Sequence, residues 1–264
     1  AAAAEAVAAN VLKQTDPDLA AAALALARED LGFGVERFEK QEPDQQSVEM
    51  LGIATMAAVE IYLATGERAY ADQARHWARL IVASQQQEVP AGLDVPITGW
   101  FHSDGRRREI LRYYHRCHEH APVLALIALC QALPDDGDWM AWYSAVTLWS
   151  HYYQKAMATV TLPYGMLGNS VWPLAEFDSR PPAEQAGWRA MAEAGTRVGN
   201  GWYVRAFGVH PNAPLYRGNN GTLLTQTKAL AAAAQLRGDL PAAQLCQEQL
   251  YWVVGRNPFC QSLM

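Results

Sequence analysis

The densest group of reactive side chains lies in residues 112–120, which read Arg-Tyr-Tyr-His-Arg-Cys-His-Glu-His. If this segment is helical, His115 and His118 share a face at a spacing of three, and Glu119 lies beside His115 at a spacing of four. Tyr114, His115 and His118 could then bind sugar hydroxyls, and Glu119 could act as a general acid. A metal site is also open, although the cysteine of the segment points away from the shared face. The plain alternative is a polar helix entry that is exposed to solvent or hydrogen-bonded within the protein.

Three stretches, residues 88–106, 161–183 and 195–221, break the helical pattern with prolines, glycines and aromatic residues. Loops of this length inside a helical domain are uncommon and are usually functional. Their aromatic side chains could stack on pyranose rings, or they could pack the loops onto helices. The candidate substrate-binding residues that these stretches add are Trp100, His102, Trp172, Trp202, Tyr216, Arg217 and Asn220. Asn220 or Thr222 could instead cap the helix that follows.

The elements that must position these residues have the period of an α-helix throughout, as in the stripe Leu51, Ala54, Ala58 and Ile61. The pairs Gly66-Glu67, Gly137-Asp138 and Gly238-Asp239 each end one helix and begin the next, because glycine takes the left-handed cap and the acid favours the next helix start. Asp16-Pro17 also predicts a helix start, with aspartate at the N-cap and proline at the first helical position. Residues 121–133 are apolar on all sides, which predicts a helix buried among neighbouring elements. The fold class is therefore all-α, built from antiparallel helix hairpins.

Length, charge and cysteine spacing exclude several classes of function. The 264 residues suffice for one large core or at most two small ones, and we expect a single domain over 1–264. The net charge of -6 gives no basic surface for nucleic acid or anionic lipid. No apolar run approaches the ~18 residues of a membrane span. The four cysteines show no CxxC spacing, which favours buried free thiols over disulfides or zinc. We expect no cofactor and no resident metal.

Two segments resemble glycoside hydrolase family 9, a family of endoglucanases and exoglucosidases. Residues 57–70, AAVEIYLATGERAY, are similar to the family's helix-turn-helix AAAELYLATGDxxY. Residues 255–264, GRNPFCQSLM, resemble its signature GxNPFGxSFVTG, and GNNGTLLTQTKALAAAAQL precedes them as in the family. The resemblance implies an (α/α)6 toroid, inverting hydrolysis of β-linked glucans, and a secreted or periplasmic protein whose partner is an oligo- or polysaccharide.

The chain departs from the family at its functional ends. The family's Asp-rich motif, which supplies the general base, is missing, and its His-x-Arg segment and catalytic Glu would follow residue 264. Cys260 also stands where the family has glycine. We therefore expect a barrel truncated at both ends, an inactive isolated chain, and apolar surface near residues 1–15 and 250–264. The catalytic residues are unknown, with Glu119 as the one candidate; Asp94, Asp104 and Asp178 form no pair with it by spacing.

Two other classes remain open. A different (α/α) toroid, an epimerase or a lyase, would use the histidine cluster and a tyrosine as acid and base. A non-catalytic helical-repeat scaffold would show a fixed period, whereas the glycine-acid joints at 66, 137 and 238 are unevenly spaced. For any toroid we expect the three long loops to meet on one side, any strands to be short and confined to them, and a helix over 107–120 to turn His115, His118 and Glu119 to the same cleft.

Overall fold

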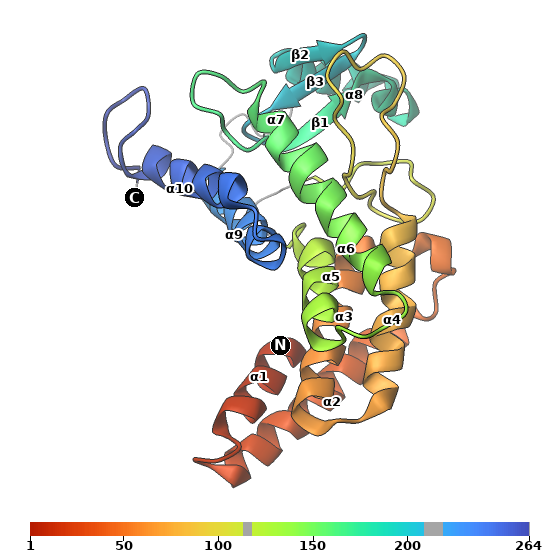
Figure 1. Cartoon of the computed structure of the whole chain (residues 1–264). Helices are drawn as coiled ribbons and strands as arrows, with labels where there is room; N and C mark the ends of the chain where they lie inside the picture. The colour runs from red at the N-terminus through yellow and green to blue at the C-terminus, as the bar shows by residue number, and fades with distance from the viewer. Residues whose placement is uncertain (113–117, 209–218, 264) are drawn as a thin grey trace. The chain divides into compact units, whose positions relative to one another are not determined.

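The computed structural model describes residues 1–112, 118–208 and 219–263 and shows a mostly helical chain with one small sheet. Figure 1 shows the helices and strands of the chain, which forms two compact units. Unit 1 comprises Ala1–Gln85, Phe101–Arg107 and Ala121–Val146. Unit 2 comprises Gln86–Trp100, Arg108–His120 and Thr147–Met264.

Unit 1 is made of helix hairpins, as the sequence predicts. Helix α1 packs against α2, and α3 packs against α1, α2, α4 and α5. The bounds are α1 Ala2–Leu12, α2 Pro17–Phe38, the 3-10 turn η1 Pro43–Gln45, α3 Val48–Thr65, α4 Arg68–Ala83, α5 Ala121–Ala132 and α6 Trp139–Thr147. The last residue of α6 is counted in unit 2.

The predicted joints cap these helices. The Asp16 carboxylate accepts a hydrogen bond from the backbone N–H of Leu19 at 3.1 Å, which satisfies one free donor of α2. Gly66 ends α3 with φ +75°, a left-handed value that a residue with a Cβ adopts only at a cost. In unit 2 the Asp239 carboxylate caps α10 by accepting from the Ala242 N–H at 3.0 Å. These three boundaries are therefore confirmed. The Gly137-Asp138 joint is wrong as a helix end, because α5 already ends at Ala132 and Gly137 does not take a positive φ.

Helix α5 is a core helix of unit 1. Most of its residues are buried, Leu126 and Leu129 completely, which confirms the buried helix over 121–133. Gly52 of α3 allows its close approach, because a Cβ at that position would lie 2.5 Å from the carbonyl carbon of Ala121. The two backbones thus touch where only glycine fits.

Helix α3 is long and apolar enough to cross a membrane by length and composition, contrary to the expectation that no run approaches this length. Half of its residues are buried inside the protein, among them Leu51, Ala58 and Ile61. A core helix passes the same test, and the packing of α3 against α4 and α5 is that of a core helix.

Unit 2 combines helices with a three-stranded antiparallel sheet in the order β1-β3-β2. Val171 pairs with Val204 and Trp172 pairs with Tyr203, and β2 has a bulge between Arg197 and Gly199. The bounds are the π-helix η2 Leu148–Lys155, α7 Ala156–Ala158, β1 Ser170–Pro173, the 3-10 helix η3 Leu174–Ser179, α8 Pro182–Glu193, β2 Thr196–Gly199, β3 Trp202–Arg205, α9 Asn219–Arg237 and α10 Leu240–Val254. The strands are short and lie in the predicted loops, as expected.

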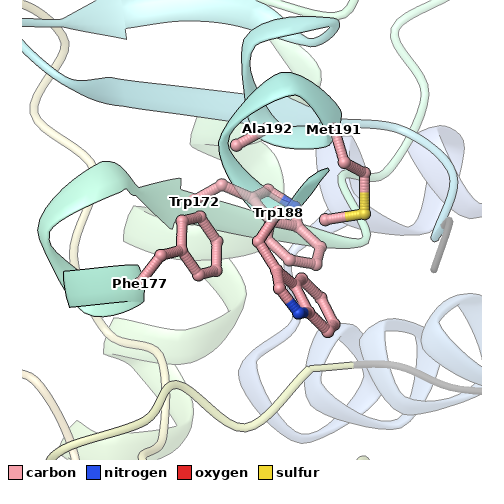
Figure 2. Packing of buried hydrophobic residues seen from close by; sticks show 5 residues of the cluster. All are labelled: Trp172, Phe177, Trp188, Met191 and Ala192. Atoms are coloured by element: carbon pink, nitrogen blue, oxygen red, sulfur yellow. The ribbon is translucent and has the colours of Figure 1, made fainter. Parts of the chain in front are cut away.

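An aromatic cluster packs beside this sheet. Figure 2 shows Trp172 of β1, Phe177 of η3 and Trp188 of α8 gathered with Met191 and Ala192. Ring centroids of Phe177 and Trp188 lie 5.7 Å apart, and those of Trp172 and Trp188 lie 6.4 Å apart. The sheet therefore has its own small core, to which the large apolar area of these rings contributes most.

Apolar side chains are exposed in both expected regions, among them Val11 and Tyr251. Exposed apolar residues also occur elsewhere, for example Phe33 and Leu240, so the feature is not confined to the ends.

Two of the cysteines, Cys130 and Cys246, are buried free thiols as predicted, and burial raises their pKa to about 12 and about 11. Cys260 is exposed.

Candidate functional site

The predicted helix over 107–120 is wrong in the part of it that the structure describes. Residues 107–112 and 118–120 are not helical, and the helix that follows begins at Ala121. Tyr114 and His115 lie outside the described residues. His118 is exposed and Glu119 is buried, so the shared face expected for them is not formed by a helix here.

Arg112 makes the tertiary contacts that hold this non-helical segment. Its guanidinium forms a bidentate ion pair with Glu176 of η3, with Nη2 and Oε2 2.7 Å apart, and both side chains are almost completely buried. Its Cζ atom also lies 4.2 Å from the ring centroid of Trp172. A partner 64 residues away thus holds the segment in place, and a bidentate, stacked arginine is among the stronger polar contacts in proteins.

Several predicted sugar platforms are buried. Trp172 is 1% exposed within the aromatic cluster, and Trp100 is 1% exposed with its ring 5.9 Å from those of Tyr153 and Trp202. Neither offers a face to a ligand, because protein side chains already cover it. Trp202 is half-buried and keeps part of its surface open. Burial also raises the pKa of Tyr153 to about 12, which leaves its phenol protonated and a poor base near neutral pH.

His102 and Asn220 make structural contacts. His102 belongs to unit 1, is 7% exposed, and its Nδ1 lies 2.9 Å from the carbonyl oxygen of Ser84. Asn220 lies in the first turn of α9 and donates through Nδ2 to the carbonyl of Leu263 at 3.1 Å. Each side chain thus holds a segment of backbone, and their assignment to sugar binding stays a prediction. Tyr216 and Arg217 lie outside the described residues.

The predicted meeting of the long loops is confirmed for the parts that belong to unit 2. The N–H of Asp94 donates to the carbonyl of Val198 at 2.8 Å, and the N–H of Asn200 donates to Gly92 at 2.7 Å. Strands β1 and β3 join residues 170–173 to 202–205. Three stretches that are distant in sequence therefore form one region of unit 2.

A cavity of about 400 Å3 opens in this region. Two of the long loops and the end of α10 supply its walls, and the residues that matter chemically are Thr161, Tyr164, Arg205, Phe207, Trp252 and Pro258. We call it the Arg205 cavity. Both loops are predicted from the sequence and Pro258 lies in the family-like segment, but the other five residues are not predicted, because nothing in their spacing brings 161–166, 205–207 and 252 together.

The family-like turn builds one wall of the Arg205 cavity. The buried Asn257 side chain donates to the carbonyls of Trp252 and Gln261, both at 2.8 Å, and accepts from the N–H of Phe259 at 3.0 Å. One carboxamide thus closes the turn after α10 and sets Pro258 beside Trp252. Trp252 in turn packs on Phe207 with ring centroids 5.3 Å apart.

Larger hollows lie elsewhere. A groove of about 470 Å3 along α2 and α3 is lined mostly by apolar side chains such as Phe33 and Ile53, with Asp30 and Arg37 also in its lining. Another of about 650 Å3 runs along α9 and α10 beside Leu240. The Arg205 cavity has a larger share of polar surface than either groove, and it combines aromatic rings with a cation and hydroxyls, as a site that orients a polar ligand does.

The Arg205 cavity has no acid-base pair. No Asp or Glu lines it among the described residues. Asp178 pairs with Arg189, and the Asp104 carboxylate accepts from the Arg106 N–H at 3.0 Å, so these two carboxylates hold local structure. Within residues 1–112, 118–208 and 219–263, no three His, Cys, Asp or Glu side chains come together to hold a metal ion. The geometry therefore supports binding more directly than catalysis.

The sequence matches no protein-family model and no curated protein. The likeness to glycoside hydrolase family 9 thus rests on the two quoted segments. In the structure these segments are the α3–α4 joint of unit 1 and the wall of the Arg205 cavity in unit 2.

Proposed function

We propose that the chain is the central part of a carbohydrate-active enzyme related to glycoside hydrolase family 9, and that the Arg205 cavity binds a sugar of its glycan substrate. The observation that carries this proposal is the placement of the family-like Asn257-Pro258 turn against an aromatic, polar cavity. By the same resemblance the glycan is a β-linked glucan, the helix hairpins belong to an (α/α)6 toroid, and the protein is secreted or periplasmic.

The lining of the Arg205 cavity suits a pyranose ring. Such a ring has apolar C–H faces and a rim of hydroxyls, so it needs aromatic surface beside hydrogen-bonding groups. Tyr164 and Phe207 are partly exposed rings on the wall, and Arg205 and Thr161 provide polar atoms. A volume of about 400 Å3 lies within the range of small-molecule pockets.

Catalysis would require two carboxylates across the scissile bond. Since none lines the described cavity, we expect the 264-residue chain to bind oligosaccharide without hydrolysing it. Release of reducing sugar from cellooligosaccharides by the purified chain would contradict this expectation.

The epimerase or lyase alternative is less well supported. It needs a tyrosine or histidine poised near neutral pH. Tyr153 is buried with a pKa raised to about 12, and His118 is exposed outside any cavity described above.

Titration of the purified chain with cellotetraose, followed by calorimetry or NMR, tests the proposal. We expect saturable binding that Tyr164→Ala weakens several-fold, because a lost stacking contact is worth about 1 kcal/mol. Tyr251→Ala is the matched control: Tyr251 is exposed on α10 and does not line the cavity. Absence of binding, or equal loss in both variants, would contradict the proposed site.

A further inference from the structure

Arg205 is an uncompensated charge in the wall of the cavity. It is the last residue of β3, is half-buried, and donates through Nη1 to the carbonyl of Met191 near the end of α8. Its stem passes over Gly195, where a Cβ would lie 2.7 Å from the Cγ of Arg205. The side chain is thus held in position by a helix carbonyl and by the space that a glycine leaves.

No acid neutralises Arg205 among the described residues. The other sheltered cations of unit 2 pair with carboxylates: Arg112 with Glu176, and Lys155 and Arg237 with Asp239. Arg205 makes no such pair, and burial alone lowers the pKa of its guanidinium. The sequence between 208 and 219 contains no Asp or Glu either, so that segment has no carboxylate to offer.

We infer that the Arg205 cavity takes an anionic sugar, a pyranose that carries a carboxylate or a sulfate. This inference rests on the proposed function for the sugar and on Arg205 for the charge. A guanidinium has five N–H donors, and the Met191 carbonyl occupies only Nη1. The remaining donors can hold a carboxylate in two parallel hydrogen bonds, a geometry that arginine favours over lysine.

The aromatic residues give the sugar part of the preference. Phe207 lies two residues after Arg205 and packs on Trp252, and Tyr164 lines the same cavity. A ring seated on this surface would direct its exocyclic anionic group to the guanidinium. A simple inorganic anion would make the charged contact but would leave the apolar wall uncovered.

The test compares ligands of matched size on the purified chain by calorimetry: cellobiose, glucuronosyl-glucose, a sulfated cellobiose, and acetate and sulfate alone. We expect both anionic disaccharides to bind about tenfold tighter than cellobiose, since a hydrogen bond between two charged groups is stronger than one to a neutral hydroxyl. Binding of the acids, but not of cellobiose, should weaken between low and high salt. The ratio of the dissociation constants of the two anionic disaccharides shows whether the cavity prefers a carboxylate or a sulfate.

Arg205→Gln should remove the preference for the anionic disaccharides and keep the affinity for cellobiose. The glutamine amide is uncharged but can still donate to the Met191 carbonyl. Arg197→Gln is the matched control: this exposed arginine of β2 donates to the Gly199 carbonyl at 3.0 Å and does not line the cavity. If Arg205→Gln does not fold, the salt dependence of the unaltered chain decides.

Each result separates the two proposals. Equal, salt-independent binding of neutral and acidic disaccharides overturns the anionic preference and leaves the glycan site standing. Binding of acetate or sulfate as tight as that of the sugar acids overturns the sugar part. Failure of every disaccharide to bind overturns both.

Discussion

The two units hold their polar side chains differently. In unit 1 the ion pairs of Arg28 with Glu67 and of Arg79 with Asp138 lie largely exposed over a core of small and aliphatic residues. In unit 2 the Arg112–Glu176 pair is buried. Packed helices satisfy their own backbone groups, whereas irregular loops need outside partners for theirs. Unit 2, which carries the loops, accordingly buries more polar side chains than unit 1.

The carboxamides of α9 and α10 show the same need. Gln226 donates to the carbonyl of Gly168 at 2.6 Å, while Gln249 accepts from the N–H of Leu167 at 3.0 Å and donates to Gly165 at 3.1 Å. Both glutamines are almost completely buried. They fix the loop that carries Tyr164 and Met166 into the wall of the Arg205 cavity.

The largest effect should come from breaking the buried pair of unit 2. Arg112→Met leaves the Glu176 carboxylate buried without its partner, and such changes cost about 3–5 kcal/mol of unfolding free energy. The matched change in unit 1, Arg28→Met, should cost less than about 1 kcal/mol because that pair is exposed. Urea unfolding of both variants measures the difference.

A double variant tests whether the loss of stability comes from the unpaired carboxylate. Replacing both partners, Arg112→Met with Glu176→Leu, removes the unpaired charge and should recover much of the loss. A double variant no more stable than Arg112→Met alone would show that the cation–π contact with Trp172, rather than the ion pair, supports this part of unit 2.

The next effect belongs to unit 1 and tests its backbone packing. Gly52→Ala would place a Cβ 2.5 Å from the backbone of Ala121, so α3 and α5 must separate, at a cost of about 1–3 kcal/mol. Gly34→Ala is the control, since nothing lies within 4 Å of the added Cβ in α2. There we expect a gain of about 0.5–1 kcal/mol. Equal effects in thermal unfolding would contradict the close approach.

These glycines and caps show how far the sequence predicts the fold. Gly66, Asp16 and Asp239 act locally, so their neighbours suffice to place the helix boundaries. The segment around Arg112 is decided by Glu176, a contact that no local pattern reveals. For the same reason the tryptophans were misassigned: composition marks Trp100 and Trp172 as notable, but only tertiary packing shows that their faces are covered.

The candidate site divides in the same way. The loops could be recognised from their length and aromatic content, and their meeting in unit 2 is confirmed. The cavity residues could not be predicted, because Tyr164, Arg205 and Trp252 come from three separate parts of the chain. Strand pairing, the buried glutamines of α9 and α10, and the Asn257 turn bring them together.

A smaller effect should sharpen the contrast in function. Phe207→Ala removes a partly exposed ring of unit 2 and should weaken oligosaccharide binding several-fold while changing stability little. Phe33→Ala removes an exposed ring from the apolar groove of unit 1 and should leave binding unchanged. Calorimetric titration with cellotetraose compares them, and a larger loss for Phe33→Ala would move the site to unit 1.

The smallest effect compares two aspartates that each follow a glycine and precede a helix, Asp138 in unit 1 and Asp239 in unit 2. Burial alone would raise the pKa of the Asp239 carboxyl, but the Ala242 N–H, Lys155 and Arg237 outweigh it and hold that pKa below its usual value. A lowered pKa in the folded state stabilises the protein above the unfolded-state pKa, about 3.9, and this stability is lost as pH falls through the folded-state pKa. Asp239→Asn keeps the cap but removes the charge.

We therefore expect Asp239→Asn to lower the free energy of unfolding by about 1 kcal/mol or less at pH 7, with the difference from the unaltered protein shrinking below about pH 4. Asp138→Asn should show almost no difference at either pH, because the Arg79–Asp138 pair is mostly exposed and screened by solvent. Urea unfolding at pH 7, 5 and 3 gives both profiles. If the two profiles coincide, the closer shielding of charge in unit 2 has no energetic consequence at this joint, and the contrast between the units is confined to the buried pair.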